Sequence, residues 1–240
     1  MGRPAILLVR LAIAVDMLQK VLTKLEAQHG SPDPPTVSDP FELVLFENVV
    51  YLLSDEKREA AFRALKENVG TSPVEILSAS HDKLFKIAKL GGMLPEARVE
   101  RFRNIAQIAL QEFEGDLASA LKAPLPKAKK ALMKFPSIGE PGAEKILLFS
   151  RSHPVLGLDS NGMRVLLRIG YGEESKSYST TYHSVRDAVR GELRPDYDWL
   201  IRAHQLLRRH GQEVCRRAEP LCRACSVKAN CQYYKQKQDE

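Results

Sequence analysis

The sequence predicts an all-α protein, because apolar residues recur at three- and four-residue spacing along most of the chain and strand signals are sparse. Short breaks that contain Gly, Pro or Asp separate these periodic segments, as expected for loops between helices. The chain has 240 residues, which is enough for one large or two small domains. Its hydrophobic fraction of 44% is ordinary for a soluble globular protein, so the helices can bury a core of normal size.

The predicted helices lie between these breaks. The segment from Gly30 to Asp39 contains three prolines and is predicted to be a linker. Ser72 and Glu75, with Pro73 at the first helical position, form a capping-box pattern that predicts a helix start. The predicted helices span residues 4–29, 40–53, 55–69, a segment from 73, 81–90, 95–113, 116–121, 128–135, 143–150, 162–169, 182–191 and 196–211.

The formal net charge of +6 fits a polyanionic partner, although many basic proteins bind nothing acidic. No apolar run approaches the length of a membrane span. The first fifteen residues look like a secretion signal, but Arg10 interrupts the apolar run and no clear cleavage site follows. We therefore expect a cytoplasmic protein, associated with the nucleoid if it is bacterial.

The most informative stretch spans residues 127–170, where the pattern predicts helix, tight turn, helix, loop and helix. The turn contains Ser137, Ile138 and Gly139. A short turn before a helix leaves backbone N–H groups that can hold a phosphate without reading bases. An ordinary helix hairpin in an all-α core explains the same pattern. Asp159 precedes the last helix and is expected to be its N-cap.

All four cysteines lie in the last 26 residues, with the spacing C-x6-C-x2-C-x5-C. Such a cluster in a chain without an export signal predicts metal ligands, and disulfides fit this chain poorly. The number of cysteines does not distinguish a zinc ion from an iron–sulfur cluster, since both accept four cysteine ligands. The cysteines are Cys215, Cys222, Cys225 and Cys231.

Residues 135–148, FPSIGEPGAEKILL, and the following LDSNGMRVLLR resemble the helix-hairpin-helix and catalytic-aspartate segments of the endonuclease III (HhH-GPD) superfamily of DNA glycosylases. The Leu-Asp-x-Asn-x-x-Arg-Val pattern at residues 158–165 is most similar to the adenine-DNA glycosylase branch. The cysteine spacing is similar to that of the [4Fe–4S] site at the C-terminus of these enzymes. Residues 40–43, PFEL, resemble the start of the first helix of the family's helical barrel.

The resemblance implies two helical domains. One is a six-helix barrel with the hairpin, at about residues 40–150, and the other is an iron–sulfur domain formed by residues 1–39 and 151–240. It also implies a [4Fe–4S] cluster on the four cysteines and a cleft between the domains for an extruded base. The implied partner is double-stranded DNA with a damaged, mispaired or abasic nucleotide, bound by a monomer.

The resemblance also implies a pair of catalytic carboxyls. Asp159 matches the family's catalytic aspartate, and Glu47 falls where adenine glycosylases carry a catalytic glutamate. Breaking an N-glycosidic bond develops positive charge on the sugar and negative charge on the departing base, so a carboxylate at the sugar and an acid at the base divide the chemistry. The plainer alternatives are that Asp159 is only an N-cap and that Glu47 is a buried carboxylate bonded to a neighbouring helix N-terminus.

Two departures from the family pattern bear on the activity. Pro141 stands where bifunctional members carry their Schiff-base lysine, which excludes lyase chemistry from that position and implies a monofunctional glycosylase. Lys145 lies one turn further along. It either serves a bifunctional enzyme or faces solvent or a DNA phosphate. Ser137 replaces the first glycine of the family's hairpin. This departure leaves an alternative function, a non-catalytic iron–sulfur protein that recognises distorted or abasic DNA.

The expected DNA contacts are partly in the hairpin and partly after the glutamate helix. Tyr51 and Leu52 stand where adenine glycosylases carry glutamines that enter the DNA gap, and they are either an apolar wedge or core. The sequence ends nine residues after Cys231, without the branch's C-terminal 8-oxoguanine domain, so we expect a thymine-mismatch, uracil or alkylated-base substrate. The full set of expected DNA contacts is Tyr51, Leu52, Ser137, Ile138, Gly139 and Lys145.

Around the cysteines lies a basic segment that a bound cluster would hold rigid as a phosphate-binding surface. A solvated charged face is the plainer explanation. The basic residues are Arg202, Arg208, Arg209, Arg216, Arg217, Arg223 and Lys228.

Overall fold

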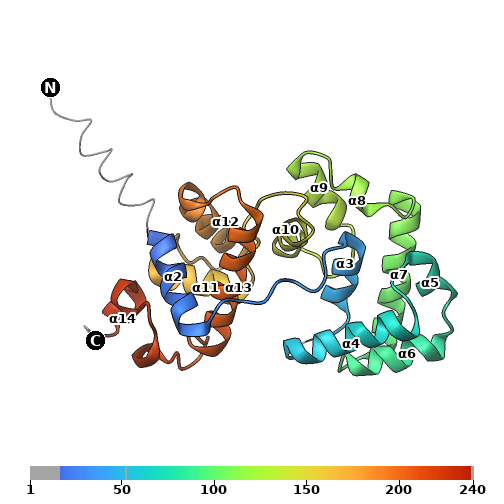
Figure 1. The fold of residues 1–240 in the computed structure, drawn as a ribbon, viewed down its shortest axis with the longest axis horizontal. Coiled ribbons are helices and arrows are strands. Elements are labelled where there is room, and N and C mark those ends of the chain that lie inside the picture. Colours follow the sequence, from blue (N-terminus) through green and yellow to red (C-terminus); the bar gives the residue numbers. More distant parts are fainter. Residues whose placement is uncertain (1–16, 52, 239–240) are drawn as a thin grey trace. The chain divides into compact units, whose positions relative to one another are not determined.

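The computed structural model describes residues 17–51 and 53–238. Within that part of the chain the regular structure is helical and contains no strand, so the all-α prediction is confirmed. Contacts among the described residues form two compact units, one within residues 35–157 and the other within residues 1–34 and 158–240 (Figure 1). None of the described helices is long and apolar enough to cross a membrane. Residues 4–16 of the first predicted helix, and Leu52, lie outside the described residues.

The described part of residues 35–157 contains eight helices. The long helix α7 packs against α3, α5, α6 and α8, while α10 packs against α3 and α9 (Figure 1). The buried face of α7 includes Phe102 and Ile105, which are inaccessible to solvent. The helices are α3 (Pro40–Asn48), α4 (Asp55–Asn68), α5 (Pro73–Ser78), α6 (His81–Leu90), α7 (Pro95–Phe113), α8 (Leu117–Ala120), α9 (Leu125–Leu132) and α10 (Glu140–Phe149).

Side-chain caps explain where several of these helices begin. The capping box predicted at Ser72 and Glu75 is present: the Ser72 hydroxyl accepts from the Glu75 amide, and the Glu75 carboxylate accepts from the Ser72 amide. Asp39 caps α3 in the same way by accepting from the Glu42 amide. Each bond satisfies an N–H group that has no partner within the helix.

Helix α3 ends at Asn48, so the prediction of a helix to residue 53 is wrong. Val49 and Val50 are both buried. The Tyr51 amide donates to the Gly91 carbonyl (3.2 Å). The chain approaches so closely here that a Cβ on Gly91 would lie 2.2 Å from the Val49 oxygen. The contacts of residues 49–51 with the loop after α6 therefore end the helix before residue 53, although the apolar periodicity continues.

Three further helix boundaries differ from the predictions. Helix α10 begins at Glu140 rather than 143, because Pro141 sits in the first turn, where its missing N–H costs nothing. Helix α12 begins at Tyr178 within a predicted loop, because the Ser177 hydroxyl accepts from the Thr180 amide. Helix α9 spans 125–132 rather than 128–135, and the residues after it form the turn.

The second unit joins distant parts of the sequence. Helix α13 packs against α11 and against α2, so a helix from the beginning of the described chain lies beside one near its end (Figure 1). Leu18, Leu22 and Leu25 of α2 are buried. The helices are α2 (Met17–His29), α11 (Ser160–Ile169), α12 (Tyr178–Val189), α13 (Tyr197–Glu213) and α14 (Gln232–Gln236), with 3-10 turns η1 (Arg190–Glu192), η2 (Cys222–Ala224) and η3 (Lys228–Asn230).

Candidate active site and cysteine cavity

Asp159 is the N-cap of α11, as predicted. Its Oδ1 accepts from the backbone amides of Asn161 (3.0 Å) and Gly162 (2.7 Å). Its Oδ2 lies 3.2 Å from Nε of Arg208 and also accepts from the Asn161 side chain. One oxygen is therefore tied to the helix, and the other is directed to side chains.

The charge on Asp159 is stabilised. Burial raises the pKa of Asp159, but His204, the Gly162 amide and Arg208 together outweigh burial and bring the pKa below its usual value. Asp159 is therefore a carboxylate at neutral pH, the form required beside a developing sugar cation. Burial and the negative charge of Asp159 both raise the pKa of the Tyr178 phenol. Sequence reasoning missed Tyr178 because it falls in a predicted loop.

Glu47 on α3 forms an ion pair with Lys145 on α10. The Lys145 Nζ lies 2.6 Å from Oε2 of Glu47, and the side chains are 23% and 19% exposed, respectively. Lys145 is thus directed to the predicted catalytic glutamate instead of facing open solvent. A lysine ammonium provides the partner that the Glu47 carboxylate needs in this mainly apolar helix.

The backbone of Lys145 is held by a close contact. A Cβ on Gly157 would lie 2.5 Å from both N and Cα of Lys145, so a residue with a side chain does not fit there. Gly157 precedes Asp159 by two residues in the sequence. A glycine that permits such an approach of two backbones leaves no periodic signal, and sequence reasoning missed it.

A buried ion cluster joins the two helices of the hairpin. The Lys129 Nζ on α9 binds Oε1 of Glu140 (2.6 Å) and Oε1 of Glu144 (3.0 Å) on α10. The Glu144 side chain is only 3% exposed. Burial lowers the pKa of Lys129, but its bonds to the two carboxylates outweigh burial and raise it above the usual value. The cluster fixes α9 against α10 around the turn.

The turn itself exposes Ser137 and Gly139 but not Ile138. Ser137 has φ +63°, the left-handed region that glycine enters without strain. The Ile138 side chain packs in the core, and its amide donates to the Phe135 carbonyl (3.3 Å). Gly139 has φ −89°, and a Cβ there would meet only a Pro141 carbon at 3.9 Å. Nothing within the protein requires glycine at 139.

An apolar surface lies beside the end of α3. The Tyr51 side chain is 56% exposed, which excludes the alternative that it is core. Its amide binds the loop after α6, and that loop carries Met93 and Leu94, both strongly exposed. Leu94 has φ +57°, a strained conformation for a non-glycine residue. These exposed residues lie in two neighbouring loops, and we call Tyr51, Met93 and Leu94 together the apolar loop pair. The apolar residues in the Gly-Gly-Met-Leu-Pro loop were a signal that sequence reasoning missed.

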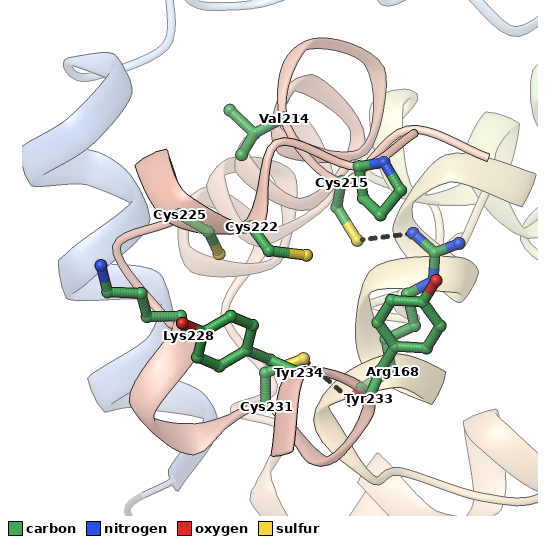
Figure 2. A pocket seen from close by; sticks show the side chains of 10 residues that line it. Arg168, Val214, Cys215, Cys222, Cys225, Lys228, Cys231, Tyr233 and Tyr234 are labelled. Atoms are coloured by element: carbon green, nitrogen blue, oxygen red, sulfur yellow. Dashed lines mark hydrogen bonds between the residues drawn. The ribbon is translucent and has the colours of Figure 1, made fainter. Parts of the chain in front are cut away.

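The four cysteines line one small cavity, with Arg168 and Tyr233 at its side (Figure 2). All four are free thiols, so no disulfide joins them. Cys215 Sγ lies 3.4 Å from an Arg168 guanidinium nitrogen, and Cys231 Sγ lies 3.2 Å from the Arg168 carbonyl oxygen. Four cysteine sulfurs around one space are the donor set that iron–sulfur clusters use.

The surroundings of two of the cavity cysteines disfavour the thiolate form. Burial raises the pKa of the Cys225 and Cys231 thiols, and the neighbouring cysteines raise it further. A bound cationic centre would offset that cost. No three Cys, His, Asp or Glu side chains among the described residues converge closely enough to hold one metal ion.

Part of the predicted basic segment is engaged within the protein. Arg208 pairs with Asp159, Arg209 with Glu213 (2.9 Å) and Arg202 with Glu26 (3.1 Å). The exposed members of the segment are thus fewer than the sequence suggests. They are Arg209, Arg216, Arg217, Arg223 and Lys228.

No protein-family model matches the chain. Among curated proteins, endonuclease III of Rickettsia conorii is 30% identical over 165 residues, which cover 68% of this chain and 70% of the relative. Endonuclease III of Thermotoga maritima is 24% identical over 200 residues, covering 83% of this chain and 86% of the relative. The chain belongs to the endonuclease III family of DNA glycosylases.

Solved structures share the fold. An endonuclease III trapped in a covalent intermediate with DNA superposes with a TM-score of 0.71, covering 93% of this chain and 98% of that one at 17% identity. A thermostable thymine-DNA glycosylase superposes with a TM-score of 0.72, covering 93% and 97% at 16% identity. At these identities the likeness establishes the fold.

Proposed function

We propose that the protein is a base-excision repair enzyme that binds double-stranded DNA, extrudes a damaged or mispaired base and hydrolyses its N-glycosidic bond. The observation that carries the proposal is Asp159. Two backbone amides anchor this carboxylate, and its environment keeps it charged although it is partly buried. A fixed negative charge of this kind stabilises a sugar cation and can orient the attacking water.

Glu47 acts at the departing base in this proposal. In the ion pair the Lys145 ammonium donates a hydrogen bond to the Glu47 carboxylate, with Nζ 2.6 Å from Oε2. The pair as a whole can therefore pass one proton to a base that leaves with negative charge. Excision by water also agrees with Pro141, which offers no amine at the family's lysine position.

The hairpin and the apolar loop pair are the proposed DNA contacts of residues 35–157. The first amides of α10 have no acceptors within the helix, and the exposed Gly139 allows a phosphate to approach them closely. Tyr51, Met93 and Leu94 present apolar groups of the kind that wedge between base steps. Contact through Ile138 is restricted by its buried side chain.

We propose a [4Fe–4S] cluster on Cys215, Cys222, Cys225 and Cys231. Four sulfur donors around one cavity are a ligand set that such a cluster uses, and the likeness of the cysteine spacing to the family's cluster site supports it over zinc. The cluster would cross-link the loop that carries most of the exposed basic residues, and it would supply no group to bond cleavage. Those residues would then contact phosphates from a rigid segment.

The likeness of residues 158–165 to the adenine-glycosylase pattern supports that branch, and a base-release screen tests both branch and activity. The purified protein is mixed with duplexes that contain adenine opposite guanine or 8-oxoguanine, thymine or uracil opposite guanine, and alkylated purines. Each reaction is read with and without hot alkali. We expect release of one base, with most strand breaks appearing only after alkali. Tight binding without release from any duplex would instead support a non-catalytic DNA-binding protein.

A further inference from the structure

We propose that Arg208 bridges Asp159 and a phosphate of the extruded nucleotide, so that one guanidinium links binding of the DNA backbone to the position of the carboxylate. The inference rests on the proposed function, because it takes Asp159 to lie beside the sugar of that nucleotide. The ligand of Arg208 is a phosphate diester, so the contact reads no base.

Arg208 is held at Asp159 by the packing of α13 on α11. A Cβ on Gly211 of α13 would lie 2.6 Å from the carbonyl oxygen of Asn161, so glycine allows the two helices to approach this closely. Arg164 of α11 ties them together, because its Nη2 donates to the Gly211 carbonyl (2.7 Å) and to Oδ1 of Asn161 (2.9 Å). The 3.2 Å contact between Arg208 Nε and Asp159 Oδ2 is thus set by two packed helices.

The contact with Asp159 distinguishes Arg208 from the other arginines of α13. Arg202 and Arg209 both pair with glutamates. Arg208 pairs with Asp159, and the side chains of this pair are 28% and 22% exposed, respectively. A substrate group can therefore reach both partners.

The structure of a nucleotide brings a phosphate to this place. The C1′ atom carries the bond to the base, and the phosphates are attached to C3′ and C5′ of the same sugar. With Asp159 beside C1′, a group in contact with Asp159 lies within the width of a sugar ring of a phosphate. A guanidinium has five N–H donors in a planar fork, so it can bond a carboxylate and a phosphate at the same time.

The balance of charge also favours the bridge. A guanidinium 3.2 Å from Asp159 offsets part of the attraction between that carboxylate and a sugar cation. A phosphate on the same guanidinium neutralises the positive charge of Arg208 and restores the negative potential at the sugar. Binding of the target nucleotide thus completes an electrostatic site that the free protein holds only in part.

A binding cycle that combines protein variants with phosphate neutralisation tests the inference. The probe is a duplex with one tetrahydrofuran abasic-site analogue, in which a methylphosphonate replaces the phosphate on the 5′ or the 3′ side of the analogue and removes its charge. We expect wild type to lose affinity about tenfold at one of these positions. Arg208→Gln should bind the unmodified duplex about tenfold more weakly and lose little more at that position, because the contact is already gone. Its plot of log affinity against log salt should be shallower by about 0.9.

Two further variants make the cycle specific. Arg202→Gln is the matched control, because Arg202 lies on the same helix and its side chain is 33% exposed, close to the 28% of Arg208. It should keep the wild-type loss at the sensitive phosphate. Arg208→Lys restores the charge without the planar fork and should recover part of the effect. Thermal melts establish that each variant is folded.

The same loss from each methylphosphonate in wild type and in Arg208→Gln would overturn the inference. So would a wild type whose affinity neither methylphosphonate changes. The cycle measures binding alone, so its outcomes are separate from those of the base-release screen. Base release with equal losses would overturn only the bridge, and an Arg208-dependent loss without base release would support the bridge and overturn only the proposed glycosylase.

Discussion

Ser137 stands in a backbone conformation that its side chain disfavours. With φ +63° it occupies the left-handed region at the hairpin turn, where the family pattern has glycine. An L-residue pays about 1–2 kcal/mol for this conformation. The strain is local, since Ser137 is exposed and the turn is fixed by the ion cluster between α9 and α10.

Ser137→Gly should therefore raise the free energy of unfolding by about 1 kcal/mol. Denaturant unfolding monitored by circular dichroism measures the change. Ser150→Gly is the matched control, because Ser150 has φ −79°, and it should give no gain. Equal effects of the two substitutions would show that Ser137 is not strained.

Because Asp159 is charged in the folded protein, the free energy of unfolding should depend on pH. Because its folded pKa lies below the reference value of 3.8, the contribution is fully present above that pH and is lost as the pH falls through the folded pKa. Asp159→Asn keeps a good cap but loses the charge pair with Arg208. We expect it to be less stable than wild type by up to about 1 kcal/mol at pH 7. Urea unfolding should show this difference shrink below pH 3.8, and a difference that grows there would contradict the assignment.

At the scale of elements, apolar periodicity predicted that the helices of the hairpin region exist, but not where each begins or which distant residues they contact. The pattern of residues 127–170 predicted three helices around a turn, and all three are present. The start of α10 was misplaced because Pro141 is accommodated in the first turn of the helix. The ion pair of Glu47 and Lys145 joins residues 98 positions apart, and no local pattern encodes such a pair.

Gly139→Ala tests the hairpin as a phosphate site. The backbone and the space around Gly139 both accept a methyl group, so stability should stay the same or rise by up to about 1 kcal/mol. DNA binding should weaken about tenfold, the loss of one good contact, because the methyl obstructs the approach of a phosphate. Gly191→Ala, also in open space but outside the hairpin, should leave affinity unchanged. Unchanged affinity in Gly139→Ala, read by fluorescence anisotropy, would rule out this contact.

For the whole molecule, sequence reasoning reached the fold class, the cap at Asp159 and the clustering of the four cysteines. Each depends on residues close in sequence or on composition. It missed Tyr178, Met93 and Leu94, because their surroundings depend on how separate helices pack. It also overestimated the basic segment, because ion pairs such as Arg202 with Glu26 are decided by tertiary structure.

The cysteine cavity should hold iron and sulfide in the purified protein. Cys222→Ser removes one of four ligands and should lose the brown colour, the visible absorbance and most of the iron, as measured by metal analysis. DNA affinity should fall with it if the cluster holds the basic segment rigid. Ser226→Ala, next to the cavity-lining Cys225, is a control that should keep full iron content. A colourless wild type that contains zinc would contradict the cluster.

The most direct test of the account compares wild type with Asp159→Asn on the duplex that the base-release screen identifies. Base release is followed in single turnover, and affinity for the same duplex is measured in parallel. We expect Asp159→Asn to release no measurable base while its Kd stays close to that of wild type, because the substitution removes the charge that stabilises the sugar cation and keeps the cap. Base release by Asp159→Asn at the wild-type rate would contradict the account.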